Sequence, residues 1–460
     1  MNWDKVYDIV ILGAGTAGLA AAIKAIKNGD SVLVLEMAKP GEFRSSMSVI
    51  AGVMDFAGTK YQEEKGVEDS PAQYTADLVN NCGGDYDLCK AFTDQLHKTL
   101  DMVENDLGLI PMDVIGGWGH SVGRCHTFEG PKVIGRLEEK ALEMGVEIAW
   151  ETPGKELVHD KVLGVTGIIA ENAGKDVAIK ANKGVVLCSG GFGYNRKLCK
   201  EFGPDHLQDL IRLMPPTHTG AGLEMALRIG AATRDIKHSL KCSLPTCIHT
   251  LADTSIQYVG GVVVNKGSQR FIREDTWYGY LGDAGAKQED GLYYIIYDDA
   301  MRKKTKKEFP TWLRHKEFKG DTIEGLAKEL KLDPAALKAT MDNYNKMAAA
   351  GEDTECGRDT LDGNFGSPIP VDNGPFYGME CKPSTTSFKG GVRIDTSNRV
   401  LDWDGYVIPR LYAAGEVSGG YFGKGGYIWG TMTVMSLTCG AIAVDDANKN
   451  KPIEAFSAAC

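Results

Sequence analysis

The first 36 residues alternate apolar runs with one glycine-rich turn. Residues 6–12 (VYDIVIL) have the continuous apolar pattern of a buried strand, and residues 31–36 (SVLVLE) have the same pattern. Between them, residues 19–29 (LAAAIKAIKNG) predict a helix that ends at its final glycine. The turn GAGTAG (13–18) joins the first strand to this helix. The order of these elements predicts a βαβ unit with a right-handed crossover.

Strand and helix patterns return in blocks along the rest of the chain. The segments GVEIAW, KELVHD, GVTGIIAE and KGVVLCSGG predict strands, and residues 219–232 predict a helix after a glycine-rich turn. From about residue 236 the pattern changes to polar loops, the strand 258–265 and two helices, TIEGLAKEL and DPAALKATMDNYNKMAAAG. Glycine-rich strands return with GGVRID (390–395).

These blocks predict an α/β fold with more than one domain, because 460 residues exceed what a single hydrophobic core usually holds. A Rossmann-like domain is expected from two pieces of sequence, 1–235 and 366–460. A second, α+β domain is expected over 236–365, inserted between the two pieces.

Composition narrows the class of partner. The chain is 43% hydrophobic and 25% charged, as in an ordinary globular protein, and its net charge of -11 disfavours nucleic acid or an anionic membrane surface as the main partner. The N-terminus has no basic segment followed by a cleavage site, and the apolar stretch 9–26 is interrupted by glycines, Thr16 and Lys24. We therefore expect a cytoplasmic protein without a membrane span.

The cysteine and histidine patterns predict no haem or metal site. The 11 cysteines form neither a CxxCH haem motif nor a paired CxxC zinc pattern, so reduced thiols are expected. The nine histidines are dispersed and predict no metal site. The run MRKKTKKEF (301–309) is interpreted as a solvated helix face, with a docking patch for a redox partner as the alternative.

The turn GAGTAG has the context that a dinucleotide site requires, with a strand before it and a helix after it. In such sites the first glycine (here Gly13) allows a tight turn, the second (Gly15) lets the backbone approach a pyrophosphate, and the third (Gly18) lets helix and strand pack closely. The helix N-terminus offers free N–H groups and a positive dipole end to the phosphates. Glu36, at the end of the second strand, is placed to accept a ribose hydroxyl.

The position of this motif and the segments that follow it favour FAD over NAD. The motif lies at the very N-terminus, FRSSMSVIAG (43–52) supplies hydroxyl groups soon after it, and two later strands end in glycines, in VVLCSGGFGYN (185–195) and LYAAGE (411–416). The predicted FAD-binding residues are Gly13, Ala14, Gly15, Thr16, Ala17, Gly18, Glu36, Ser45, Ser46, Gly52, Ser189, Gly190, Asn195, Gly415, Glu416, Thr431 and Met432.

With these motifs the chain resembles the FAD-dependent fumarate reductase and 3-ketosteroid dehydrogenase superfamily of flavoproteins. The resemblance also covers the TGxG turn at 219–222, GGVVVNKGSQRFIRE (260–274), KATMDNYNKMAAAGEDTECGRD (338–359) and the C-terminal glycine-rich segment. It implies a glutathione-reductase-type FAD domain with a substrate-capping insertion. It also implies hydride transfer between flavin N5 and one carbon of a C–C bond beside a carbonyl, with a side chain moving a proton at the other carbon.

Four polar anchors typical of the fumarate reductase branch are absent at the matching positions. Tyr278 stands in place of an arginine four residues after Glu274, and Ser387 replaces a histidine in SFKGG. Leu244 stands where a His-Pro-Thr histidine is expected, and GYFGKGGYIWG contains no arginine. Dicarboxylates need such groups, so the pattern disfavours fumarate-like substrates.

The 3-ketosteroid dehydrogenase branch matches better. The stretch YFGKGGYIWGTMT aligns without a gap with the ketosteroid motif, which puts Tyr421 and Gly425 at the positions that polarise the substrate carbonyl oxygen. Tyr278 matches the tyrosine that handles the proton. The resemblance therefore implies Tyr278, Tyr421 and Gly425 as catalytic. Lys424 replaces a proline and Trp429 a small residue, so a substrate smaller than a steroid is also compatible.

Other aromatic residues have less specific expectations. Tyr427 and Trp429 are expected in the pocket wall or core, and Trp118 and His120 either line the same pocket or belong to an ordinary loop.

The expected function is thus desaturation of a 3-ketosteroid-like or cyclic ketone, or reduction of the corresponding enone, with a separate electron donor or acceptor. One alternative is a reductase of an unsaturated carboxylate. It needs arginines in the cleft, for which Arg44, Arg124, Arg270 and Arg273 are the candidates. The other alternative is a flavin-binding electron-transfer protein without small-molecule turnover.

Overall fold

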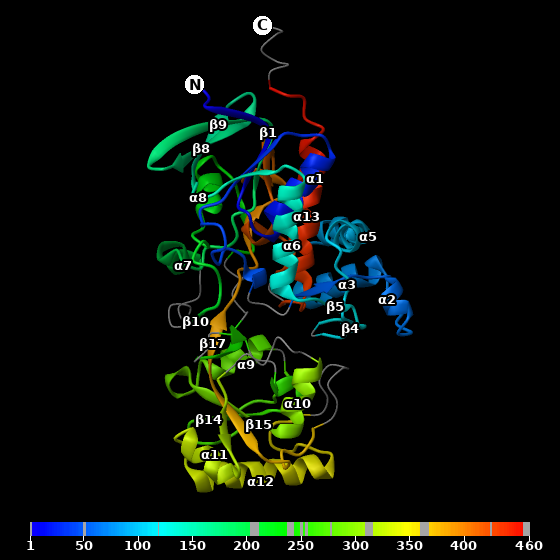
Figure 1. Ribbon diagram of the computed structural model, residues 1–460, viewed down its shortest axis with the longest axis vertical. Coiled ribbons are helices and arrows are strands. Elements are labelled where there is room, and N and C mark those ends of the chain that lie inside the picture. The colour runs from blue at the N-terminus through cyan, green and yellow to red at the C-terminus, as the bar shows by residue number, and fades with distance from the viewer. Residues whose placement is uncertain are drawn as a thin grey trace.

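The computed structural model describes residues 2–48, 52–117, 119–202, 211–236, 243–248, 252–253, 256–276, 278–308, 316–358, 368–423 and 426–453. Figure 1 shows two lobes stacked along the long axis of the molecule. The lobe that carries both termini contains the predicted dinucleotide motif, and the other lobe contains most of the central third of the chain.

The first lobe is built on an eight-stranded sheet. Its main path runs in the order β19–β20–β9–β1–β2–β6, with β8 joined to β9 and β7 to β8. The neighbours β20/β9, β9/β1, β1/β2 and β2/β6 are parallel. The strands are β1 (Lys5–Leu12), β2 (Val32–Leu35), β6 (Glu147–Ala149), β7 (Gly154–Asp160), β8 (Gly164–Asn172), β9 (Lys175–Leu187), β19 (Arg399–Leu401) and β20 (Val407–Ala413).

Helices cover this sheet and build a side layer. The helix α1 (Thr16–Lys27) packs against α13 (Thr431–Ala447) and α6 (Gly130–Glu143), and the three run side by side in Figure 1. Gly440 of α13 lies so close to α1 that a Cβ there would stand 2.4 Å from the carbonyl oxygen of Ala17. The remaining helices of this lobe are α2 (Lys60–Glu63), α3 (Pro71–Cys82), α4 (Tyr86–Thr93), α5 (Leu96–Asp101), α7 (Arg196–Phe202) and α8 (Ala221–Arg228).

Two small sheets complete the first lobe. One consists of β3 (Val53–Asp55), β5 (Cys125–Thr127) and β4 (Asp113–Ile115), and the other of β11 (Thr233–Arg234), β18 (Gly391–Arg393) and β21 (Ser418–Gly419). The second sheet brings β11, which precedes the central third of the chain, next to β18 and β21, which follow it.

The second lobe contains a seven-stranded sheet with helices. Its path is β13–β12–β17–β15–β14, with β10 and β16 also paired to β17. The strands are β10 (Ile211–Arg212), β12 (Ser243–Cys247), β13 (Ala252–Asp253), β14 (Val262–Asn265), β15 (Tyr293–Asp298), β16 (Phe318–Gly320) and β17 (Phe376–Thr385). The helices are α9 (Tyr278–Gly285), α10 (Asp299–Glu308), α11 (Ile323–Glu329) and α12 (Pro334–Ala350).

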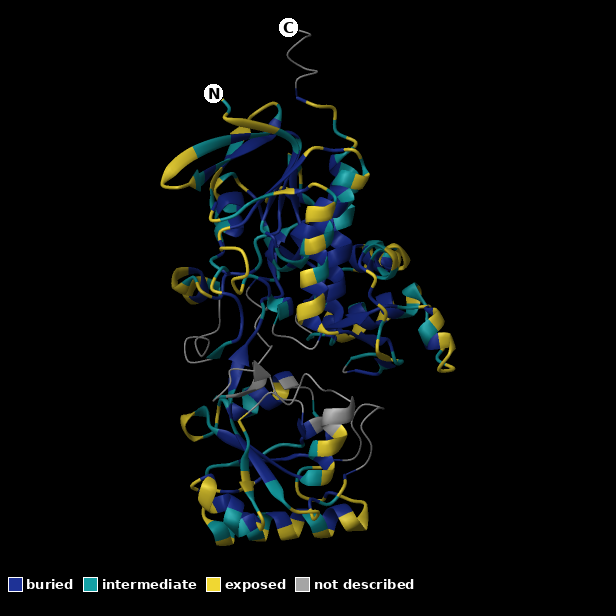
Figure 2. Cartoon of the chain, viewed as in Figure 1, coloured by how far each residue is buried: buried dark blue, intermediate teal, exposed yellow. Residues whose placement is uncertain are grey.

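Each lobe has a hydrophobic core of its own. One core joins residues from Ile9 to Ile236 with residues from Phe388 to Ala447, and the other runs from Ile256 to Cys381. Figure 2 shows the buried interiors as separate dark regions. The second sheet takes β10 and β17 from outside the predicted insertion 236–365, so its strands extend past both predicted ends. The domain boundaries themselves stay a prediction.

The predicted elements are largely present. The βαβ unit is formed by β1, α1 and β2, and the α/β fold class is confirmed. The predicted strand 258–265 is shorter, because a 3₁₀ turn (Ile256–Val259) precedes it and Gly260, with φ of 128°, separates the two. In the lysine-rich run, Lys303 is exposed and pairs with Asp299 one turn earlier on α10, as on a solvated helix face. No described helix is long and apolar enough to cross a membrane.

Candidate functional site

The surroundings of the three glycines of GAGTAG are compatible with the roles expected of them. Gly13 has φ of 108°, and a Cβ there would lie 2.4 Å from the carbonyl oxygen of Cys188. A Cβ at Gly18 would lie 1.9 Å from the carbonyl oxygen of Gly13, so helix and turn touch. A Cβ at Gly15 would meet nothing within 4 Å. Gly15 therefore faces open space, where a ligand can approach the backbone.

The first turn of α1 has the features of an anion-binding helix N-terminus. Gly15 is its N-cap and makes no side-chain cap, and no acidic residue lies in the first turn. The free N–H groups and the positive end of the helix dipole therefore face the space beside Gly15. The hydroxyls of Thr16 and Ser45 lie 3.4 Å apart at this end.

Glu36 is buried at the end of β2 and holds the turn in place. One carboxylate oxygen accepts from the N–H of Ala14 and the other from the N–H of Ala38, both at 2.8 Å. A carboxylate has about four acceptor sites, so the side chain retains capacity for a ligand hydroxyl. Its expected contact with a ribose remains a prediction.

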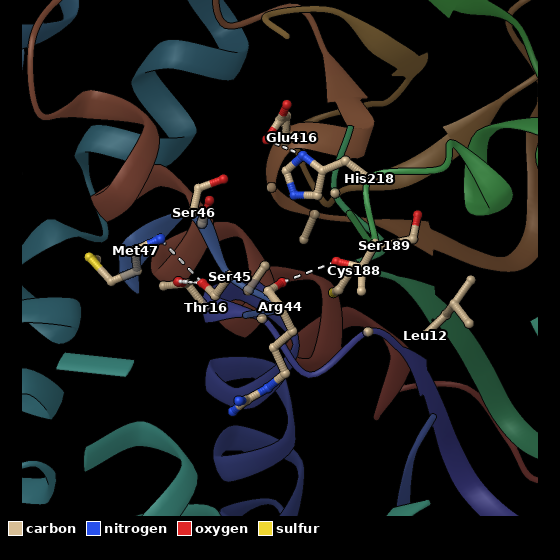
Figure 3. Close-up of a pocket in the computed structure, with 18 of the residues that line it drawn as sticks. Leu12, Thr16, Arg44, Ser45, Ser46, Met47, Cys188, Ser189, His218 and Glu416 are labelled. Carbon is tan, nitrogen blue, oxygen red and sulfur yellow. Dashed lines mark hydrogen bonds and ion pairs between the residues drawn. The ribbon is translucent and has the colours of Figure 1, made fainter. Parts of the chain in front are cut away.

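These groups open into one pocket at the carboxyl ends of β1, β2, β9 and β20 (Figure 3). The pocket encloses about 1250 Å³ of empty space, its open mouth included. Of the predicted FAD-binding residues, its lining contains Gly13, Gly15, Thr16, Ala17, Glu36, Ser45, Ser46, Ser189, Gly190, Gly415, Glu416 and Met432.

Several polar atoms in this lining have no protein partner. They are Ser46 Oγ, Ser189 Oγ and His218 Nδ1, all shielded from solvent. Buried polar atoms are rarely left unsatisfied in folded proteins. These atoms are therefore available for hydrogen bonds to a polar ligand bound in the pocket.

Some predicted FAD-binding residues support the pocket without lining it. The N–H of Ala14 is used by Glu36, and Gly18 packs on the turn. A Cβ at Gly52 would lie 2.5 Å from backbone atoms of Phe128 and Gly130, so this glycine serves packing. Asn195 caps the start of α7 and donates to the carbonyl oxygen of Thr219. These four residues and Thr431 do not line the pocket, and their contact with the cofactor stays a prediction.

Thr431 belongs to a buried polar network behind the first turn of α13. Its hydroxyl donates to Asp55 at 2.9 Å and lies 2.8 Å from the hydroxyl of Tyr74. His120 Nε2 lies 3.5 Å from the same carboxylate and 2.9 Å from the carbonyl oxygen of Trp429. Asp55, His120 and Cys125 could each offer one atom to a metal ion, and these three atoms lie within 4.8 Å of one another. Asp55 and His120 already take part in the hydrogen bonds just described. The thiol of Cys125 is directed at the carbonyl oxygen of Trp429.

Tyr421 does not face the pocket, contrary to its predicted catalytic position. It is 3% exposed, its hydroxyl lies 3.1 Å from Cys439 Sγ on α13, and its ring packs edge-on against Phe92. Burial raises the pKa of this phenol well above its usual value. The glycine-rich segment turns the side chain into the first core, so a role in polarising a substrate has no support in this geometry.

The structure does not describe Gly425 or the side chain of Tyr278, the other two predicted catalytic residues. Gly425, together with Lys424 and Trp118, lies outside the described residues, and Tyr278 is described only as the first residue of α9. Tyr427 lines the pocket, and Trp429 packs against the second core. The aromatic residues of the glycine-rich segment therefore reach from the pocket to the other lobe.

All four arginines that could have bound a substrate carboxylate have carboxylate partners in the protein. Arg124 pairs with Asp69 and Asp77, and Arg44 with Glu138. Arg270 pairs with Glu274 and Asp353, and Arg273 with Asp275. These partners raise the pKa of Arg124 and Arg270 further above their usual range, against the opposing effect of burial.

Lys389 is a buried cation close to the pocket. It is 3% exposed and follows the loop residues Thr386 and Ser387, which line the pocket. Its ammonium group lies 5.3 Å from the ring centroid of Tyr427.

Residues 8–425 match a protein family described as FAD binding domain. The chain belongs to this family. FAD is therefore its cofactor, and the predicted fumarate reductase and 3-ketosteroid dehydrogenase superfamily is confirmed. At this level the protein is an FAD-dependent reductase or dehydrogenase of the fumarate reductase family.

Individual relatives come from both branches. The chain is 31% identical over 457 residues to a probable fumarate reductase, Ifc3, of Shewanella frigidimarina. The alignment covers 97% of this chain and 76% of that protein. The open conformation of a flavocytochrome c3 fumarate reductase superposes with a TM-score of 0.83 at 30% identity, over 97% of this chain and 79% of that one. A 3-ketosteroid-Δ4-(5α)-dehydrogenase from Rhodococcus jostii RHA1 superposes with a TM-score of 0.74 at 25% identity, over 98% of both chains.

The main pocket residues that the sequence analysis missed come from two loops. Thr217, His218 and Thr219 precede α8, and Thr386 and Ser387 follow β17. The polar triplet before the glycine at 220 was the available signal for the first loop, and the small hydroxyl residues before SFKGG were the signal for the second.

Proposed function

We propose that the protein is an FAD-dependent oxidoreductase that acts on a carbon–carbon bond beside a ketone, either by desaturation or by the reverse reduction of an enone. The observation that supports this choice is the state of the four candidate arginines, each of which already pairs with a carboxylate of the protein. A dicarboxylate bound by one of these arginines would have to compete with its carboxylate partner, whereas a ketone needs only neutral donors.

The chemistry divides between the cofactor and the chain. FAD supplies the hydride acceptor or donor. The chain must donate hydrogen bonds to the carbonyl oxygen and move one proton at the neighbouring carbon. We assign the proton to Tyr278 at the start of α9, since phenols, whose ordinary pKa is about 10, donate readily in the reductive direction.

The segment 421–430 supports a substrate site between the lobes. Tyr427 lines the cofactor pocket, and Trp429 packs on the core of the second lobe. A substrate lying against this segment would contact both the cofactor and the capping lobe. With Tyr421 turned into the core, backbone N–H groups of the segment, including Gly425, are the proposed donors to the carbonyl oxygen.

A reductase of an unsaturated carboxylate is the second candidate, and Lys389 favours it. The buried ammonium group beside a pocket-lining tyrosine places positive charge near the pocket in addition to the four arginines. The fumarate reductases among the relatives agree with an anionic substrate.

Tyr278→Phe is expected to retain FAD and to lower kcat by about 10²–10⁴-fold, because it removes the proposed proton donor. Turnover of an enone by the reconstituted enzyme measures this. Tyr421→Phe is the matched control, because its hydroxyl bonds only within the core; it should keep turnover and lose about 1 kcal/mol of stability. Full activity of Tyr278→Phe would remove the assignment, and loss of turnover in Tyr421→Phe would restore the catalytic role of that tyrosine.

The substrate class is tested by anaerobic reoxidation of the photoreduced enzyme. A 3-keto-Δ4-steroid, cyclohexenone, acrylate and fumarate are added separately, and recovery of the visible band of oxidised flavin is followed. Rapid reoxidation by an enone and slow reoxidation by both acids is the expected result. Reoxidation by acrylate or fumarate that Lys389→Met abolishes would establish the second candidate instead. No reoxidation by any of them would argue for an electron-transfer protein.

A further inference from the structure

A pair of ionisable side chains lies inside the cofactor pocket, opposite Glu36. His218 stands in the turn before α8, and Glu416 stands in the 3₁₀ turn after β20. Figure 3 shows the imidazole directed at the carboxylate, and His218 Nδ1 lies 3.7 Å from Glu416 Oε2. Their side chains are 6% and 9% exposed. The distance is too long for a hydrogen bond, so a neighbour is needed to satisfy His218 Nδ1.

The backbone around the pair is fixed. The N–H of His218 donates to the carbonyl oxygen of Pro215 at 3.0 Å, and its carbonyl oxygen accepts from Tyr194 at 2.9 Å. A Cβ at Gly190 would lie 2.7 Å from His218 Nε2, and one at Gly191 would lie 2.3 Å from Glu416 Oε1. These two glycines thus make room for the pair, and the pair in turn faces the pocket.

The order of the strands indicates which part of FAD would lie next to His218 and Glu416. Across the carboxyl edge of the sheet the order is β2, β1, β9 and β20, which presents Glu36, the Gly13–Gly15 turn, Ser189 and then Glu416. Along FAD the order is adenosine ribose, pyrophosphate, ribityl chain and ring. With ribose at Glu36 and pyrophosphate at α1, the next two strand positions, about 10 Å farther, meet the ribityl hydroxyls.

We propose that His218 binds a ribityl hydroxyl of FAD through Nδ1, beside the carboxyl group of Glu416. One hydroxyl donates to His218 Nδ1 and accepts from the protonated carboxyl group of Glu416, or a second hydroxyl donates to Glu416. The assignment does not depend on which substrate is reduced.

Electrostatics agree with a pair that is neutral as a whole. Burial raises the pKa of Glu416 to about 8, although the N–H of Phe388 at 2.7 Å opposes this, and burial lowers the pKa of His218 to about 4. The other charged residues of the lining are Glu36, which accepts two backbone N–H groups, and Arg44, which pairs with Glu138. Lys389 follows Phe388, with its ammonium group over the ring of Tyr427.

A neutral carboxyl avoids repulsion from the nearby pyrophosphate, which gives the proposal a pH signature. Below about pH 8 Glu416 keeps its proton, and FAD affinity should not change with pH on its account. Above that value the free pocket loses this proton, while bound FAD disfavours the ionised form. Affinity should therefore fall by up to about tenfold per pH unit.

The test compares FAD with ADP, which lacks the ribityl chain, by titrating both into apoprotein and measuring binding calorimetrically. His218→Ala should weaken FAD about three- to tenfold, the worth of one neutral hydrogen bond, and leave ADP unchanged. His218→Gln should recover part of the loss. His126→Ala is the control, a buried imidazole outside the pocket bonded to Thr59 and to the carbonyl oxygen of Arg124. It should leave both affinities unchanged.

The pH arm uses the unmodified protein and Glu416→Gln. The unmodified protein should lose FAD affinity above pH 8, and the variant should not. Equal losses of FAD and ADP affinity in His218→Ala, no loss at all, or the same pH profile in Glu416→Gln would each overturn the proposal.

Discussion

Arg124→Met is expected to lower the free energy of unfolding by about 3–5 kcal/mol, the usual cost of breaking a buried ion pair from one side. Arg124 is fully buried, pairs with Asp69 at 2.7 Å and with Asp77, and lies 4.6 Å from the ring centroid of Tyr74. Methionine fills much of the same volume but leaves two carboxylates without a counter-charge. Urea denaturation of the apoprotein measures the loss.

Lys338→Met is the control for this prediction. Lys338 pairs with Asp342 one turn later on α12, but both side chains are largely exposed. Such surface pairs contribute about 0–1 kcal/mol. If Arg124→Met unfolded within 1 kcal/mol of the unmodified protein, the Asp69–Arg124–Asp77 cluster would not stabilise the first lobe as argued.

Gly15→Ala and Gly18→Ala are expected to fail in different ways, although they change neighbouring positions of one motif. A Cβ at Gly15 meets nothing within 4 Å, so the apoprotein should keep its stability. The methyl group would instead occupy the approach of the pyrophosphate. Losing one or two charge-assisted hydrogen bonds of about 1.5–3 kcal/mol each should weaken FAD binding at least about tenfold.

Gly18→Ala should destabilise the apoprotein itself. Its Cβ would lie 1.9 Å from the carbonyl oxygen of Gly13, and overpacking of this kind costs about 1–3 kcal/mol or more. Thermal unfolding of both apoproteins and titration with FAD separate the two effects. Equal thermal stabilities, or unchanged FAD affinity in Gly15→Ala, would contradict the roles assigned to these glycines.

Most of the residues that the sequence predicted for the cofactor line one pocket, because strand ends determine where they lie. Glycine turns after β1, β9 and β20 must meet at one edge of a parallel sheet, and the residues just after those strands line the pocket. His218 could not be found in this way, because a single histidine in a loop has no periodic pattern. Only the fold shows that its turn faces Glu416.

Side-chain direction explains the corrections at the C-terminal segment. Successive residues of a helix point about 100° apart, so Met432 and Thr433 line the pocket while Thr431 bonds to Asp55. Tyr421 lies in an aperiodic stretch, directly after Gly420 with φ of 117°. A gapless alignment fixes its place along the chain but does not fix which side of the backbone carries the phenol.

One strand joins the two hydrophobic cores to the cofactor pocket. β17 pairs with β15 and β16 at Phe376, deep in the second lobe, and with β10 at Ser384 and Thr385. Thr386, the next residue, already lines the pocket. Ten residues of strand span about 33 Å, so a tilt of about five degrees at the pocket end displaces the far end by about 3 Å. Any rotation of the second lobe that carries β17 with it would therefore move the loop at Thr386, next to the cofactor.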